Sequence, residues 1–238
     1  MLPDSCTLLY TIRGGPAMKI LNKLKKLVQI SITKTIRFNF HYFGWGGVLH
    51  PCILITHNVK IVNLGGSVEV KDSSIGAVRI GFFQVGTEDI RFHRTIWNNT
   101  GKIVFEGRAK VGSGTRISNN GEIIFGENFV VTSNSTFISQ KRIAFGKNCL
   151  VSWECLFMDT DFHKIYSDAN NDEQINPDCS ILIGSNVWIG CRTTVLKGTE
   201  VSGGNVIDAG SVLHGHYSMN NAIIDGNRII KNNIRWED

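Results

Sequence analysis

The 238-residue sequence predicts an all-β fold: a left-handed parallel β-helix with an N-terminal helical extension, an inserted loop and a short C-terminal cap. Two internal repeats carry this prediction, one of six residues toward the C-terminus and one of twenty residues in the middle of the chain. Apolar residues make up 42% of the chain, which is enough for a packed core, and 25 glycines with only 4 prolines favour tight turns between short strands.

The six-residue repeat runs from residue 183 to residue 218. Its six blocks each open with an aliphatic residue: Ile183, Ile189, Val195, Val201, Ile207 and Leu213. Three such blocks form one triangular coil, in which each side is a short parallel strand with an inward anchor and Gly, Asn or Ser turns the corner. An ordinary parallel β-protein does not explain this strict phase. A right-handed β-helix is the other alternative, but regular hexads are typical of the left-handed type, an exception to the usual crossover rule.

The twenty-residue repeat lies upstream. Residues 101–120, 121–140 and 141–160 align without a gap, so that Ile103, Ile123 and Ile143 correspond, as do Ile117, Phe137 and Phe157. Residues 181–190 repeat residues 143–152 at an offset of 38, which is one coil plus an insertion of 18 residues. We expect coils stacked at roughly 4.8 Å, one corner widened by the two extra residues, and a cap at each end.

The flanking segments do not follow these repeats. Residues 59–83 predict one or two irregular first coils, and residues 220–238 leave the hexad phase and predict a final loop and cap. Residues 19–37 carry apolar residues near helical spacing and predict an amphipathic basic helix. The expected division is an N-terminal basic extension over 1–60 and a β-helix domain over 61–238, interrupted by a loop at about 160–178.

Charge is distributed unevenly along the chain. Residues 5–68 contain eight Lys or Arg and no Asp or Glu, whereas the other residues carry 17 basic and 20 acidic side chains, a net charge of −3. A basic arm on a mildly acidic body suggests an anionic partner, with a solvated helix face as the alternative. A second methionine, Met18, opens the arm, so the natural start is either Met1 or Met18.

Several protein classes are disfavoured. The six cysteines form no CxxC pair and have no zinc-finger spacing, and no secretion signal precedes them, so we expect reduced, packed thiols in the cytoplasm. No apolar stretch approaches the ~18 residues of a membrane span. The sequence has no P-loop, dinucleotide fingerprint or base-reading motif, which argues against nucleic acid as a partner.

Several motifs together identify a family resemblance. The hexads, "VWIG" at residues 187–190, "DAGSV" at 208–212 and "DGN" at 225–227 resemble the hexapeptide-repeat acyltransferases. More narrowly, "RFNFHYF" at 37–43, "RTIW" at 94–97 and "MDTDFH" at 158–163 are similar to bacterial capsular-polysaccharide and lipopolysaccharide O-acetyltransferases. The resemblance covers about residues 35 to 230 and implies a homotrimer with active sites between subunits. It also implies an acyl-CoA donor, usually acetyl-CoA, that runs along the β-helix toward a histidine on a projecting loop.

The candidate general base is His163. Transfer of an acyl group from a thioester to a hydroxyl needs a base, stabilisation of the oxyanion and a groove for the donor. Histidine suits the first role because its ordinary pKa is near 6.5. His163 lies where the insertion leaves the repeat, and either Asp159 or Asp161 could orient it.

The resemblance also assigns donor-binding residues. Trp188 would form a wall of the channel, and the backbone near Gly190, Cys191, Ala209 and Ser211 would contact the pantetheine arm. Cys191 stands where the family more usually has Ser or Ala. Lys197, Arg228 and Lys231 are candidates for the phosphates, although Arg228 replaces the usual proline of a Gly-Asn-Pro motif and His214-Gly215 replaces a usual Thr-Lys.

No metal is expected. Related β-helical carbonic anhydrases bind zinc through three histidines, but here His214 and His216 are two residues apart and far in sequence from His163. The function expected is acetyl-CoA-dependent O-acetylation of a sugar hydroxyl of a bacterial surface polysaccharide or its precursor. The basic arm would contact the anionic inner membrane surface. The alternatives are N-acylation of an amino sugar, acetylation of an antibiotic, or a non-catalytic scaffold.

Overall fold

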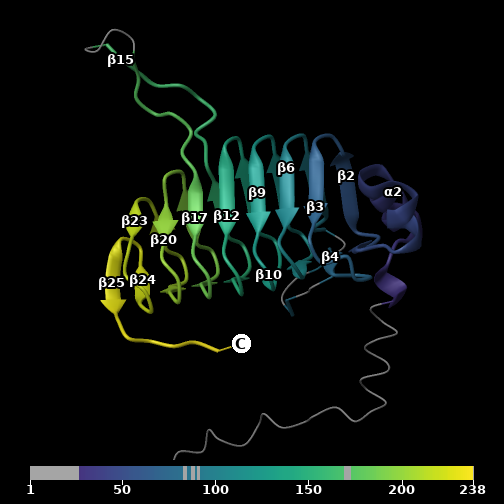
Figure 1. Ribbon diagram of the computed structural model, residues 1–238. Coiled ribbons are helices and arrows are strands. Elements are labelled where there is room, and N and C mark those ends of the chain that lie inside the picture. The colour runs from purple at the N-terminus through teal and green to yellow at the C-terminus, as the bar shows by residue number, and fades with distance from the viewer. Residues whose placement is uncertain (1–26, 83–84, 87–88, 90–91, 169–172, 238) are drawn as a thin grey trace, which may run out of the picture.

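The computed structural model describes residues 27–82, 85–86, 89, 92–168 and 173–237. Three parallel sheets form the sides of a β-helix, with a helix at one end and a projecting loop near the other (Figure 1). The chain therefore has the predicted left-handed β-helix fold. None of the helices in the described part of the chain combines the length and hydropathy needed to cross a bilayer.

Each sheet takes one strand from each of seven coils, and the first sheet also contains the last two strands of the chain. The first sheet contains β1 (Ile53–Ile55), β4 (Val78–Ile80), β7 (Ala109–Val111), β10 (Phe129–Val131), β13 (Leu150–Val151), β18 (Trp188–Ile189), β21 (Val206–Ile207), β24 (Ile223–Asp225) and β25 (Arg228–Lys231). The second sheet contains β2 (Val59–Asn63), β5 (Thr95–Asn99), β8 (Arg116–Asn119), β11 (Thr136–Ser139), β14 (Leu156–Met158), β19 (Thr194–Leu196) and β22 (Val212–Leu213). The third sheet contains β3 (Ser67–Val70), β6 (Lys102–Phe105), β9 (Glu122–Phe125), β12 (Arg142–Phe145), β17 (Ile181–Ile183), β20 (Glu200–Val201) and β23 (His216–Tyr217).

The strand register confirms both repeats. Ile123 pairs with Ile103, and Phe157 pairs with Phe137, at the offset of twenty residues. Ile181 pairs with Ile143, at the offset of 38. The six hexad anchors are all buried, as their spacing predicts: Ile183, Ile189, Val195, Val201, Ile207 and Leu213.

Stacked side chains fill the interior of the wider coils. The Phe137 and Phe157 rings lie parallel with centroids 4.9 Å apart, and the Phe125 and Phe105 rings stack at 5.2 Å. These contacts repeat because equivalent residues of neighbouring coils point to the same place, so each coil is stabilised by the next.

The corner between the second and third sheets accommodates the two residues by which each twenty-residue coil exceeds three hexads. Phe137 and Phe145 are eight positions apart around this corner, whereas Val195 and Val201 are six apart in a later coil. Four side chains at the wide corner are completely buried: Asn99, Asn119, Ser139 and Asp159. The Asn119 side-chain amide donates to Asn99 Oδ1 at 2.7 Å, so polar side chains bridge successive coils there.

The N-terminal helix does not have the predicted bounds. Residues 27–29 are helical, Ile30 then forms an isolated bridge to Thr56, and Ser31 caps α2 (Ile32–Leu49). The stripe over 19–37 therefore spans a break, and the helix continues to Leu49. Residues 19–26 lie outside the described residues.

Helix α2 covers the first coil. Phe38 is fully buried, and the centroids of its ring and the Trp97 ring lie 5.0 Å apart. The Asn39 side-chain amide donates to the Ile53 carbonyl at 2.7 Å. These contacts with β5 and β1 stabilise the helix across the non-helical Gly44, which local propensity alone would disfavour. The first strand of the β-helix begins at Ile53.

The opposite end is closed by an antiparallel strand. β24 continues the first sheet, and β25 then turns back against it, with Asp225 opposite Arg228. This arrangement is the short C-terminal cap expected from the loss of hexad phase. The chain beyond β25 runs back along the β-helix (Figure 1).

Candidate functional site

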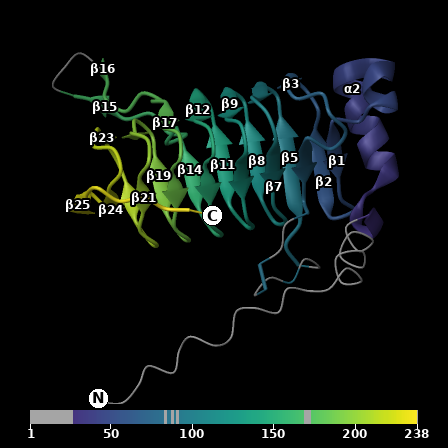
Figure 2. The same cartoon turned by 60° about the horizontal axis from the view of Figure 1, so that its bottom comes forward.

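The insertion leaves the β-helix from the wide corner. β14 ends at Met158 and the coil resumes at β17, which begins at Ile181. Between them the chain projects away from the body and forms the antiparallel pair β15 (Tyr166–Ser167) and β16 (Glu173–Gln174) (Figures 1 and 2). Residues 169–172 lie outside the described residues.

Lys197 fixes the base of the insertion. It follows β19 on the rigid coil, and its ammonium nitrogen donates to Asp161 Oδ2 at 2.5 Å and to the carbonyls of Asn176 at 2.9 Å and Pro177 at 3.2 Å. Asp161 lies on the outgoing arm and the other two on the returning arm. A single half-buried cation therefore holds both arms of the insertion against the β-helix.

Asn176 links the two arms directly. Its amide nitrogen donates to Asp161 Oδ2 and to the His163 carbonyl, both at 2.8 Å, and its Oδ1 accepts from the Ile165 backbone at 2.6 Å. These contacts fix the backbone on both sides of residue 164. This role could not be predicted from the sequence, because Asn176 becomes a neighbour of Asp161 only through the return of the chain.

His163 is exposed beside a small cavity. The cavity has a volume of about 270 Å³ and is lined by residues of both arms, including Phe162, His163, Gln174 and Asn176. Phe162 adopts a positive φ of 60°, a rare conformation for a bulky residue, and turns the chain sharply before His163. Within the described residues, no hydrogen bond involves the imidazole, so both ring nitrogens are available to a ligand.

The two candidate aspartates have different surroundings. Asp159 is fully buried, and its carboxylate accepts from Ser139 Oγ at 2.9 Å and from the backbone of Gln140 at 2.7 Å and Lys141 at 3.0 Å. Asp161 is exposed, and hydrogen bonds from Lys197 and Asn176 hold its carboxyl pKa below the usual value. Neither carboxylate is hydrogen-bonded to the His163 ring in the described structure.

The candidate pantetheine contacts lie together at another corner. Gly190 and Cys191 turn the chain between the first and second sheets, and Ala209 and Ser211 do so one coil later. The Gly210 amide donates to the Cys191 carbonyl at 2.8 Å, and a Cβ on Gly190 would lie 2.7 Å from the Ala209 nitrogen. The absence of a side chain at Gly190 therefore allows the two coils to approach closely. Ser211 is buried and its Oγ accepts from the Gly226 amide.

Trp188 has a partner that the sequence did not reveal. Its indole nitrogen donates to Ser152 Oγ at 3.1 Å, and its ring lies 6.1 Å from that of Trp236 in the C-terminal tail. Trp236 in turn donates to the Asn186 carbonyl at 2.8 Å. A lone tryptophan in a polar tail was the only sequence signal for this contact.

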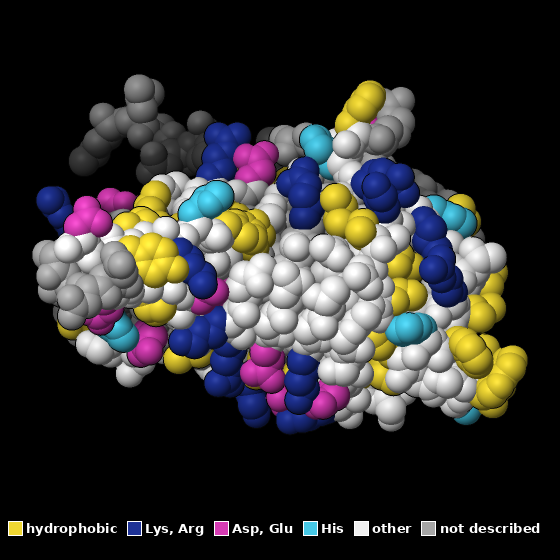
Figure 3. All heavy atoms as spheres, turned by 90° about the horizontal axis from the view of Figure 1, so that it is seen from above, with side chains coloured by type: hydrophobic (Ala, Val, Ile, Leu, Met, Phe, Trp, Pro, Cys, Tyr) yellow, Lys and Arg dark blue, Asp and Glu magenta, His cyan; other side chains and the backbone are white. Residues whose placement is uncertain are grey.

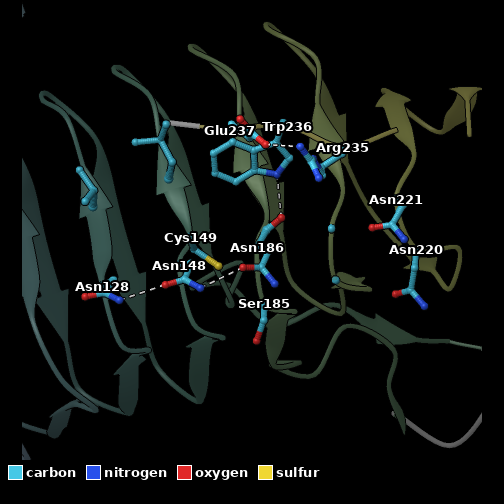
Figure 4. Close-up of a pocket in the computed structure, with 14 residues that line it drawn as sticks. Asn128, Asn148, Cys149, Ser185, Asn186, Asn220, Asn221, Arg235, Trp236 and Glu237 are labelled. Atoms are coloured by element: carbon cyan, nitrogen blue, oxygen red, sulfur yellow. Dashed lines mark hydrogen bonds and ion pairs between the residues drawn. The ribbon is translucent and has the colours of Figure 1, made fainter. Parts of the chain in front are cut away.

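The tail bounds a larger cavity of about 740 Å³ (Figure 4). It is lined by Arg235, Trp236 and Glu237 and by asparagines of successive coils. Asn128, Asn148 and Asn186 form a hydrogen-bonded ladder on its floor, with side-chain distances of 3.1 and 3.0 Å (Figure 4). None of the candidate site residues named above lines this cavity.

The candidate residues thus form three groups. His163, Asp161 and Lys197 lie at the insertion, Trp188 and the small residues near Gly190 lie on the first sheet and its corner, and the exposed Arg228 and Lys231 lie on β25. The second sheet separates the insertion from the corner at Gly190. Among the described residues, no three His, Cys, Asp or Glu side chains are grouped as metal ligands.

Comparison with known proteins shows the fold. No protein-family model and no curated protein sequence matches the chain. The polySia-specific acetyltransferase NeuO is a structural match at a TM-score of 0.58 and 20% identity, over 78% of each chain. The polysialic acid O-acetyltransferase OatWY matches at a TM-score of 0.49 and 22% identity, over 76% of this chain and 88% of that one. A galactoside acetyltransferase in complex with coenzyme A matches at 0.32 and 14% identity, over 91% and 90%.

Proposed function

We propose that this chain is an acyltransferase that uses acetyl-CoA to O-acetylate a sugar hydroxyl of a bacterial surface polysaccharide or its precursor. The observation that carries the proposal is the anchored insertion. A structural scaffold gains nothing from breaking its repeat, whereas here the break presents a histidine on arms that Lys197 and Asn176 hold against a rigid body. The fold shared with the acetyltransferase NeuO supports the same conclusion.

His163 acts as the general base in this proposal. An imidazole nitrogen takes the proton of the acceptor hydroxyl as its oxygen attacks the thioester carbonyl. The tetrahedral intermediate collapses, the C–S bond breaks, and the imidazolium returns the proton to the departing thiolate. The products are the acetyl ester and free coenzyme A, and the histidine is neutral again. Asp161 positions the histidine through Asn176 and the loop backbone. Asp159 instead stabilises the wide corner of the β-helix by accepting its hydrogen bonds.

The donor would lie along the corner at Gly190, Cys191, Ala209 and Ser211, beside Trp188, in a groove that a neighbouring subunit would complete. Its phosphates would lie near Arg228 and Lys231. We do not assign Lys197 to the phosphates of the donor, because its ammonium group already donates to three hydrogen-bond acceptors. Gly190 and Ser211 are buried at this corner, whereas the small residues Ala209 and Gly210 are exposed and leave room for a pantetheine arm to lie close to the coil.

Two copies of the chain would complete one site. The groove and His163 lie on different edges of the second sheet, so we place the histidine of one subunit over the groove of its neighbour in a homotrimer. A closed ring of this kind presents the same two edges at each interface and creates three equivalent sites.

The test is release of coenzyme A from acetyl-CoA in the presence of sialic acid polymers, neutral oligosaccharides and amino sugars. His163→Ala is expected to lower kcat by about 10²- to 10⁴-fold, whereas His50→Ala, at the far end of α2, leaves it unchanged. Unchanged turnover in the His163 variant would remove the proposed base. Product that resists mild alkali would indicate transfer to an amine instead of a hydroxyl.

A further inference from the structure

Helix α2 has an outer face that nothing in the described structure covers. The inner face, with Thr35, Phe38 and Asn39, is buried against the first coil. On the outer face, Ile32, Ile36 and Phe40 repeat every fourth residue and are 70%, 45% and 47% exposed. Residues at this spacing form one continuous line along a helix.

The apolar line continues past the kink at Gly44. The Phe40 and Trp45 rings contact edge to face at 5.1 Å, and Trp45 and Leu49 are each 72% exposed. We call these five residues, Ile32, Ile36, Phe40, Trp45 and Leu49, the α2 ridge. Figure 3 shows hydrophobic side chains gathered at the α2 end of the molecule, with histidine and basic side chains beside them. A contiguous apolar patch of this kind on a protein surface marks an interaction site.

The basic residues near the α2 ridge indicate that its partner is anionic. Arg37 and His41 each follow a ridge residue and are exposed beside it. Between Ser5 and Val68 the chain has eight basic residues and no acidic one. Lys34 is engaged with the His57 and Val59 carbonyls, whereas the exposed Arg37 makes no hydrogen bond or ion pair within the described part of the chain and is available to an external anion. Apolar side chains flanked by cations are the composition of a helix that lies in the interface of an anionic bilayer.

We propose that the α2 ridge inserts into the surface of an anionic lipid bilayer, with the surrounding cations held at the headgroups. Burial of the five ridge side chains supplies the apolar contribution, and the excess basic charge supplies the attraction to the lipid. The helix lies at one end of the β-helix, so this contact orients the coils away from the membrane. The proposal does not depend on the enzymatic activity.

The experiment is sedimentation of the full chain with vesicles of phosphatidylcholine alone and of phosphatidylcholine with phosphatidylglycerol. We expect binding to the anionic vesicles only. Raising the ionic strength from about 0.01 M to about 1 M should weaken it, because the Debye length falls from about 30 Å to about 3 Å. Replacement of Ile32, Ile36 and Phe40 by serine is expected to lower the partition coefficient at least about tenfold.

The matched control is Ile75→Ser, which removes an isoleucine that is 63% exposed outside α2. It should bind vesicles like the unmodified chain. Circular dichroism and molecular mass are measured for every variant. Failure of the unmodified chain to bind anionic vesicles, or equal binding by the serine variant, overturns the proposal. A smaller oligomer in the serine variant also overturns it, because the ridge would then be an interface between copies of the chain.

Discussion

The Lys197 ammonium nitrogen lies 2.5 Å from Asp161 Oδ2, and this ion pair joins the rigid coil to the loop that carries His163. The lysine side chain is only 15% exposed. The pair therefore fixes where the loop starts, and the position of the histidine depends on it.

Loss of this pair is expected to affect turnover more than donor binding. In Lys197→Met the loop loses three hydrogen bonds at its base, and a histidine displaced by about 1 Å costs up to about 10²-fold in kcat. The KM for acetyl-CoA should change little. Steady-state kinetics separate the two constants, with Lys147→Met, at an exposed pair with Glu127, as the control. A raised KM with normal kcat would mean that Lys197 binds the donor phosphates after all.

Because of this ion pair, the anchoring of the loop depends on pH and weakens in acid. Hydrogen bonds from Lys197, then from Asn176, lower the pKa of the Asp161 carboxyl in the folded chain. The ion pair therefore contributes its full stability above the unfolded pKa of about 3.9, and this contribution is lost as the pH falls through the lowered folded value. We expect the Asp161 carboxyl, followed by NMR, to titrate below the ordinary range. In Lys197→Met its pKa should rise toward 3.9, and an unchanged value would exclude the lysine as the cause.

The buried carboxylate of Asp159 is expected to matter for stability. Asp159→Ala leaves the Ser139 hydroxyl and two backbone amides without an acceptor, which should lower the free energy of unfolding by about 3 kcal/mol. Asp159→Asn retains one acceptor oxygen and should lose less. Calorimetry measures both effects, and turnover is then compared per folded molecule. Near-normal turnover in the folded asparagine variant fits a structural role, whereas a loss as large as that of His163→Ala would return Asp159 to the catalytic group.

Sharing of the site between subunits predicts complementation. His163→Ala removes the base, and Ala209→Trp fills the groove at an exposed position, so each variant alone should be at least about 100-fold less active. Trimers assembled from equal amounts of both should recover about a quarter of normal activity, because one pairing in four joins an intact histidine to an intact groove. No recovery in verified mixed trimers would place the whole site within one subunit.

The periodicity of the sequence predicted which residue of each coil is an inward anchor. Ile103, Ile123 and Ile143 occupy equivalent positions because an inward anchor must recur once per strand, and this rule is local. The bounds of α2 could not be found in this way. Its glycines at 44, 46 and 47 suggest a break, and the contacts of Phe38 with β5 and of Asn39 with β1 outweigh them.

The site was only partly predictable, because a repeat shows local spacing and not contacts between residues far apart in sequence. His163 stands out because it interrupts a repeat. Lys197 was expected to bind phosphate, since a cation near the end of a coil has no local partner, and its partners Asp161 and Asn176 lie 36 and 21 residues away in sequence. The contact of Trp188 with Trp236 spans 48 positions and follows no repeat.

The wide coils between α2 and the insertion also act as a spacer. Each adds one rise of roughly 4.8 Å along the axis, and each is interchangeable with the next because residues 101–120, 121–140 and 141–160 keep one register. Removal of residues 121–140 would preserve the anchors and both ends while moving His163 one rise closer to α2. The number of coils thus sets the height of the loop that carries His163 above α2, and that height can change only in whole steps.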